Sequence, residues 1–179
     1  MATQIALFRG INVGKAKRIA MADLHTMFES LGFGNVRTLL NSGNVVFDAG
    51  RSSAAANAKR IADALIEHTG IAANTVVLTA KDLEVAIAAN PFIARIDDPS
   101  RMLLGFLTAA ADRGPLKALV DGAAKDETVA LVAQTLYLWC PQGILESKVA
   151  ETLIGPKFRH LVTTRNWATV RKLQAIAAR

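Results

Sequence analysis

The sequence has few of the residues that build metal sites or disulfide frameworks. Of its 179 residues, one is cysteine and three are histidines, at positions 25, 68 and 160. A single cysteine excludes a disulfide within the chain and a thiolate-rich zinc site. The histidine spacing matches no HExxH or other paired-ligand motif. We therefore expect no metal site, and the sequence identifies no cofactor.

Long apolar runs are also missing. No stretch approaches the ~20 consecutive apolar residues that cross a bilayer. Arg9 interrupts the apolar N-terminal segment, so we expect neither a membrane span nor a signal peptide, and the expected location is the cytoplasm. Apolar residues nevertheless make up 51% of the chain, which suffices for a buried core and argues against a disordered chain.

Positive charge is concentrated at the two ends of the sequence. The net charge is +6; residues 1–20 carry +4, residues 141–179 carry +5, and the segment between them carries −3. If the ends meet after folding, they form one basic surface that attracts phosphate or carboxylate groups. The alternative is that these side chains are solvated faces of ordinary helices.

The first half of the chain predicts a strand–helix–strand–strand–helix–strand order, followed by a helix. Apolar residues at helical spacing end at Gly32, and strand-forming runs flank the turn Asn41-Ser42-Gly43. The expected elements are strand 3–9, helix 20–31, strands 36–40 and 44–48, a helix capped by Ser52 or Ser53 that ends at Gly70, strand 74–79 and helix 81–89.

The second half predicts the same order of elements. Its expected elements are strand 101–108, helix 114–123, strands 127–132 and 135–140, helix 146–154, strand 160–163 and a last helix 164–178 capped by Thr163 or Thr164. Two βαββαβ units imply two antiparallel sheets with helices on one face of each. The other face of each sheet then needs a cover, which is the other half, a partner or a ligand.

Several short motifs, in a fixed order, resemble the DUF1697 family over nearly the whole chain. They are Arg9-Gly10-Ile11-Asn12-Val13-Gly14, Leu31-Gly32-Phe33, Asn35-Val36-Arg37-Thr38, Ser42-Gly43-Asn44-Val45-Val46-Phe47, Pro141-Gln142-Gly143-Ile144, Ser147-Lys148 and Thr164-Arg165-Asn166-Trp167. The resemblance implies an α+β fold of two ferredoxin-like repeats and implies no reaction. We expect a first repeat at 1–90, a linker at 91–100, and a second repeat with the C-terminal helix at 101–179.

The segment after the first strand is a candidate anion site. Gly10 and Gly14 lie between a strand and a helix, where phosphate-binding loops occur. The glycine spacing and Ala16 do not fit a P-loop, which needs four residues between the glycines and Ser or Thr after the lysine. The remaining hypothesis is an anion held by backbone N–H groups and by Lys15 or Lys17, and the alternative is an ordinary connecting loop.

The remaining candidate residues lie at the ends of other predicted elements. Arg165 and Asn166 fall near a predicted helix N-terminus, where an arginine is either neutralised by a neighbour or available to an anion. The complete predicted anion set is Arg9, Asn12, Lys15, Lys17, Ser42, Asn44, Lys148, Arg165 and Asn166. Ser42 has no context of a catalytic serine, and no catalytic residue is identified.

Tyr137 and Trp139 share one face of a predicted strand because they are two residues apart. Ferredoxin-like domains that bind RNA place base-stacking aromatics on such a strand, so stacking is one hypothesis for this pair. Packing against the rest of the protein is the alternative. Leu136, Leu138 and Cys140 take the opposite face, which we expect to contact the helices.

Three functions fit these observations. The first is binding of a phosphate-bearing ligand, a nucleotide or nucleic acid, through a basic surface formed by the two chain ends. The second is an enzyme that acts on an anionic small molecule in the cleft between the repeats. The third is a structural protein that docks a partner, including a second copy in a homodimer.

Overall fold

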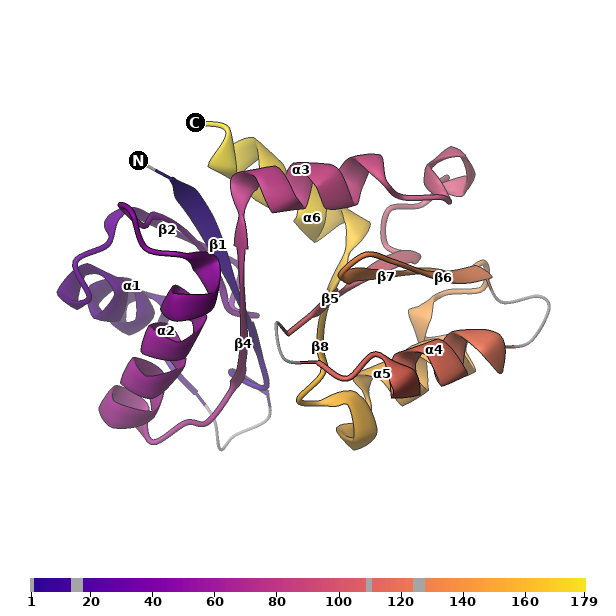
Figure 1. Cartoon of the computed structure of the whole chain (residues 1–179), viewed down its shortest axis with the longest axis horizontal. Helices are drawn as coiled ribbons and strands as arrows, with labels where there is room; N and C mark the ends of the chain where they lie inside the picture. The colour runs from indigo at the N-terminus through magenta and orange to yellow at the C-terminus, as the bar shows by residue number, and fades with distance from the viewer. Residues whose placement is uncertain (1, 14–17, 109–110, 124–127) are drawn as a thin grey trace. The chain divides into compact units, whose positions relative to one another are not determined.

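The computed structural model of the chain has an α+β fold with two compact units (Figure 1). The structure describes residues 2–13, 18–108, 111–123 and 128–179. The first unit comprises Met1–Glu84 and Leu173–Arg179, and the second comprises Val85–Lys172. The boundaries expected from the sequence, with a first repeat at 1–90, a linker at 91–100 and a second repeat at 101–179, stay a prediction.

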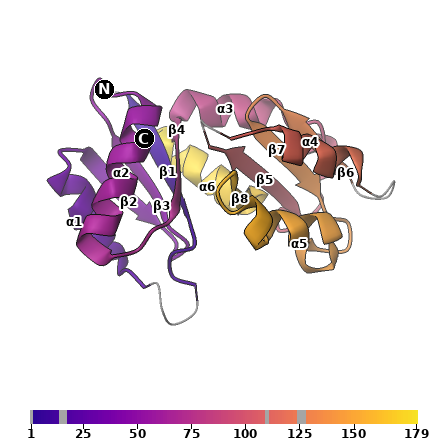
Figure 2. The same cartoon turned by 60° about the horizontal axis from the view of Figure 1, so that its bottom comes forward.

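The first unit is a four-stranded antiparallel sheet. Its helices lie on one face of the sheet, as Figure 1 and Figure 2 show. Its elements are β1 (Thr3–Arg9), α1 (Met21–Ser30), β2 (Gly34–Leu39), β3 (Asn44–Asp48), α2 (Ala54–Thr69) and β4 (Asn74–Thr79). The strand order is β2-β3-β1-β4, and each neighbouring pair is antiparallel. The βαββαβ prediction for this half is confirmed.

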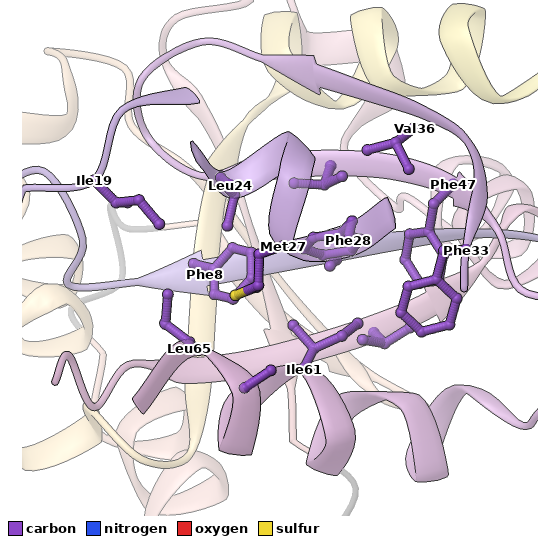
Figure 3. Close-up of a cluster of buried hydrophobic side chains, with 14 of the residues drawn as sticks. Phe8, Ile19, Leu24, Met27, Phe28, Phe33, Val36, Phe47, Ile61 and Leu65 are labelled. Atoms are coloured by element: carbon purple, nitrogen blue, oxygen red, sulfur yellow. The ribbon is translucent and has the colours of Figure 1, made fainter. Parts of the chain in front are cut away.

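Aromatic rings fill the space between the first sheet and its helices (Figure 3). Phe28 on α1 lies with its ring centroid 5.1 Å from that of Phe47 on β3, and the rings of Phe33 and Phe47 are 4.5 Å apart. Phe8 of β1 meets Phe28 edge to face at 6.3 Å. Full burial of such side chains contributes ~2–3 kcal/mol each, so this cluster holds β1, α1 and β3 together.

The second unit repeats this order of elements. Its elements are β5 (Met102–Leu107), α4 (Gly114–Asp121), β6 (Thr128–Val132), β7 (Thr135–Trp139), α5 (Lys148–Ile154) and β8 (Val162–Asn166). The strand order is β6-β7-β5-β8, again antiparallel throughout. Leu136, Leu138 and Cys140 belong to the core that β7 shares with α4 and α5, which confirms the face expected from their alternation.

The remaining α-helices of the described residues are α3 (Ala80–Ala88) and α6 (Trp167–Ala177), and short 3-10 helices lie at Ile93–Arg95, Ile144–Glu146 and Pro156–Phe158. The start of α6 corrects the sequence prediction, because Thr163 and Thr164 are strand residues rather than helix caps. They pair with Phe106 and Gly105 of β5, and a β-branched threonine suits a strand. The cap is Asn166, whose Oδ1 accepts the backbone N–H of Thr169 at 3.0 Å.

Candidate functional site

In the connection between β1 and α1, the residues that directly follow β1, Gly10 to Asn12, have a sharply turned backbone. Gly10 follows β1 with φ +90°, a conformation that glycine adopts without a steric penalty. Ile11 then turns inward and is buried in the core of the unit. Asn12 follows with φ +55°, a left-handed conformation that asparagine tolerates better than most residues. The chain therefore leaves the sheet along a fixed path.

The side chain of Asn12 holds the two ends of this connection together. Its Nδ2 donates to the carbonyl of Asn41 at 2.8 Å, and its Oδ1 accepts the backbone N–H of Ile19 at 2.8 Å. Asn12 thus joins the residues before α1 to the turn between β2 and β3. In the structure it is a positioning residue of the site, and its direct contact with a ligand stays a prediction.

The turn between β2 and β3 packs against the same connection. The carbonyl of Gly43 accepts the backbone N–H of Phe8 at 2.9 Å. Asn44 is fully buried, and its Nδ2 donates to the carbonyl of Leu39 at 2.8 Å and to Oγ of Ser42 at 3.0 Å. Asn44 therefore fixes the turn from inside, while Ser42 lies at its exposed surface.

A pocket of about 450 Å³ opens where these segments meet the N-terminus of α1. Its lining residues are Asn12, Arg18, Ile19, Ala20, Met21 and Asn41. Ala20 is the N-cap and offers no side-chain acceptor, so the first N–H groups of the helix lack the partner that serine or aspartate would provide. These N–H groups carry the positive end of the helix dipole.

Two charges modify the field at this pocket. Arg18 is exposed and lines the pocket, so its guanidinium adds a full positive charge next to the helix N-terminus. Asp23 lies in the first turn of α1 and lines a neighbouring groove together with His68.

Three residues of the predicted anion loop, Gly14, Lys15 and Lys17, lie outside the described residues. Arg9 ends β1, where it pairs with Asn74 of β4.

The other predicted anion ligands belong to the second unit. Lys148 is exposed at the start of α5, where Oγ of Ser147 caps the helix by accepting the N–H of Ala150 at 3.1 Å. Arg165 lies on β8 opposite Leu104 and directly precedes Asn166, the cap of α6, so it is near a helix N-terminus as predicted. Its Nη1 donates to the carbonyl of Thr164 at 2.7 Å, and burial lowers the pKa of Arg165 to about 10. The guanidinium therefore stays charged at neutral pH.

The aromatic pair of β7 lies inside the protein. Tyr137 is fully buried and Trp139 is 7% exposed. The hydroxyl of Tyr137 donates to the carbonyl of Ala86 at 2.7 Å, and burial raises the pKa of this hydroxyl. This placement favours the packing alternative, and a role in base stacking stays a prediction.

The structure brings some of the predicted residues together and adds others. Asn12, Ser42 and Asn44 surround one connection in the first unit, whereas Lys148, Arg165 and Asn166 lie in the second unit. The pocket also includes Arg18 and Asn41, which the predicted set omitted. The sequence held a signal for each residue. Arg18 lies just before a predicted helix, and Asn41 lies in a glycine-containing turn. In the described parts of the chain, His, Cys, Asp and Glu form no cluster of three that could hold a metal.

The described residues contain no helix that is both long and apolar enough to cross a membrane.

The order of the strands in each sheet, and the repetition of that order in the second sheet, define the class as a duplicated ferredoxin-like α+β protein. The family described as "Protein of unknown function (DUF1697)" matches residues 1–137. The chain therefore belongs to the DUF1697 family, as the sequence motifs predict.

A solved structure shares this fold. The conserved bacterial protein SP0830 from Streptococcus pneumoniae has a TM-score of 0.82 and 23% sequence identity, with 98% of each chain covered. At this identity the likeness establishes the fold and carries no statement about activity. No curated protein sequence matches the chain.

Proposed function

We propose that the protein binds a phosphate-bearing ligand, a nucleotide or nucleic acid, in the pocket at the N-terminus of α1. The observation that carries the proposal is a helix N-terminus without a side-chain cap, next to an exposed arginine, in a pocket of about 450 Å³. Backbone N–H groups at such a terminus and a guanidinium are both favourable partners of a phosphate group. The cytoplasmic location expected from the sequence is part of this proposal.

The geometry around the pocket supports a preformed site. Asn12 joins Ile19 to Asn41 through two hydrogen bonds of 2.8 Å, and Gly43 and Asn44 fix the turn next to Asn41. A ligand that enters a preformed pocket loses less free energy to ordering of the protein. The same proposal includes the basic residues of the second unit. With them, both chain ends would form one basic surface for the ligand.

Replacing Arg18 with alanine tests the proposal. The variant should bind AMP, pyrophosphate and short fluorescent oligonucleotides about tenfold more weakly, because a charge-assisted hydrogen bond is worth ~1.5–3 kcal/mol. Fluorescence polarisation and calorimetry at two salt concentrations measure this loss. A steep salt dependence identifies nucleic acid as the ligand, since each phosphate contact releases counterions.

Arg51→Ala is the matched control for this experiment. Arg51 is exposed in the same unit and does not line this pocket, so its loss should leave binding unchanged. Equal affinities of wild type and Arg18→Ala, or no binding of any phosphate-bearing probe at micromolar protein, would contradict the proposal. The enzyme and partner-docking hypotheses stay predictions, and no specific observation among the described residues favours either.

A further inference from the structure

A second pocket of the first unit lies where β1, β2 and β3 meet the end of the chain. Its volume is about 520 Å³, within the usual range for small-molecule sites. Its lining residues are Thr3, Asn35, Val36, Arg37, Asp48 and Arg179. All of them belong to the first unit, and none lines the pocket at the N-terminus of α1. The site is therefore independent of the proposed phosphate site.

Two arginines form the positive side of this pocket. Nη1 of Arg37 donates to the carbonyl of Ile176 at 2.7 Å, and its Nε donates to the carbonyl of Asn35 at 3.4 Å. The backbone N–H of Arg179 also donates to the carbonyl of Ile176, at 3.3 Å. One carbonyl thus brings the guanidinium of Arg37 and the backbone of Arg179 to the same place, and both residues line the pocket. No hydrogen bond to a described residue occupies the Nη2 donors of Arg37, and its guanidinium is already held in position.

Asp48 forms the negative side. Its Oδ1 accepts the hydroxyl of Thr3 at 3.2 Å, and its Oδ2 accepts Nδ2 of Asn35 at 2.6 Å. One hydrogen bond to each oxygen fixes the carboxylate and leaves each oxygen able to accept another. Among the described residues, neither Arg37 nor Arg179 comes within 4.0 Å of this carboxylate as an ion pair. Opposite charges therefore share the pocket without a direct ion pair between them among the described residues.

We propose that this pocket binds a free α-amino acid in its zwitterionic form. The arginines bind the carboxylate group of the ligand, since guanidinium donors match carboxylate geometry. Asp48 and Oδ1 of Asn35 accept hydrogen bonds from its ammonium group. The fixed charges also discriminate: an inorganic anion meets the repulsion of Asp48, and a simple amine meets that of the two arginines.

The test uses the full chain, with any affinity tag placed away from Arg179. The twenty proteinogenic amino acids are added in small pools at about 5 mM, a concentration that detects millimolar affinity, and backbone amide resonances are followed by NMR. At least one amino acid should shift the amides of Asn35, Val36 and Arg37 in a saturable way. Its analogues that lack either the amino or the carboxyl group should bind at least about tenfold more weakly.

Two variants separate the two halves of the recognition. Arg179→Ala should weaken binding of the amino acid about tenfold, because it removes a carboxylate partner without removing a hydrogen bond that holds Asp48. Asp48→Asn should also weaken binding of the amino acid, yet strengthen binding of the carboxylic acid analogue that lacks the amine. Arg113→Ala, an exposed arginine of the second unit, is the control and should change nothing.

Three results would overturn the proposal. They are the absence of a shift at Asn35, Val36 and Arg37 with every amino acid, an unchanged affinity in both Arg179→Ala and Asp48→Asn, and inorganic phosphate that binds this pocket as tightly as the amino acid. None of these results bears on the phosphate site at α1, because the two pockets share no lining residue.

Discussion

Replacing Phe28 with alanine is expected to lower the free energy of unfolding by about 3–5 kcal/mol. Phe28 is fully buried, and its ring contacts those of Phe8, Phe33 and Phe47, with centroid distances from 5.1 to 6.3 Å. Alanine leaves a cavity among aromatic rings that come from β1, β3 and the residue before β2, so the surroundings cannot collapse to fill it. Typical domains have only ~5–15 kcal/mol of net stability.

Urea unfolding followed by circular dichroism measures this loss, and hydrogen exchange locates it. The exchange of β1 and β3 amides should accelerate most, because these strands carry Phe8 and Phe47. Glu29→Ala is the neighbouring control on α1, since the side chain of Glu29 is 60% exposed and exposed substitutions usually change stability by less than ~0.5 kcal/mol. A loss of unfolding free energy below about 1 kcal/mol for Phe28→Ala would contradict the packing of Phe28 in the core.

Replacing Gly43 with alanine is expected to cost about 2–4 kcal/mol of stability and to weaken phosphate binding. Gly43 has φ +79°, and a Cβ added there would lie 2.5 Å from Cδ1 of Ile11 and 3.0 Å from Cβ of Phe8. The first distance is far inside van der Waals contact, so Ile11 must move. Ile11 adjoins Asn12, and its displacement would disturb the residue that positions the pocket.

Gly32→Ala separates the steric clash from the backbone strain. Gly32 has nearly the same φ, +78°, but a Cβ added there meets nothing within 4 Å. Gly32→Ala should therefore lower the free energy of unfolding by only about 1 kcal/mol, the penalty of an alanine in the left-handed conformation. Thermal and urea unfolding of both variants give the comparison. Equal losses at the two glycines would show that Gly43 and Ile11 are not in close contact.

The repeated order of elements was predictable because its signals are local. Apolar residues at helical spacing, glycines after helices and a glycine-containing turn each act within a few residues of sequence. The boundary between β8 and α6 was predicted wrongly for the same reason. Thr163 and Thr164 are good helix caps by local rules, and only their pairing with Gly105 and Phe106 makes them strand residues.

The candidate sites were predictable only in part, because distant segments form them. The sequence drew attention to Asn12, but its bonds to Asn41 and Ile19 span 29 and 7 residues. The hydrogen bond from Arg37 to Ile176 joins residues 139 apart, and no local pattern predicts such a contact. The same limit explains why the pocket of Arg37, Asp48 and Arg179 was not predicted.

The most direct test of the account is an NMR titration of the isotope-labelled protein with AMP and with pyrophosphate. The account predicts that the backbone amides of Met21, Ala22 and Asp23 move downfield in a saturable way, because N–H groups at the start of α1 donate to the phosphate. Amides of α4 (Gly114–Asp121) should not move. Unmoved amides at Met21–Asp23 under saturating ligand, or shifts confined to other segments, would contradict the central claim.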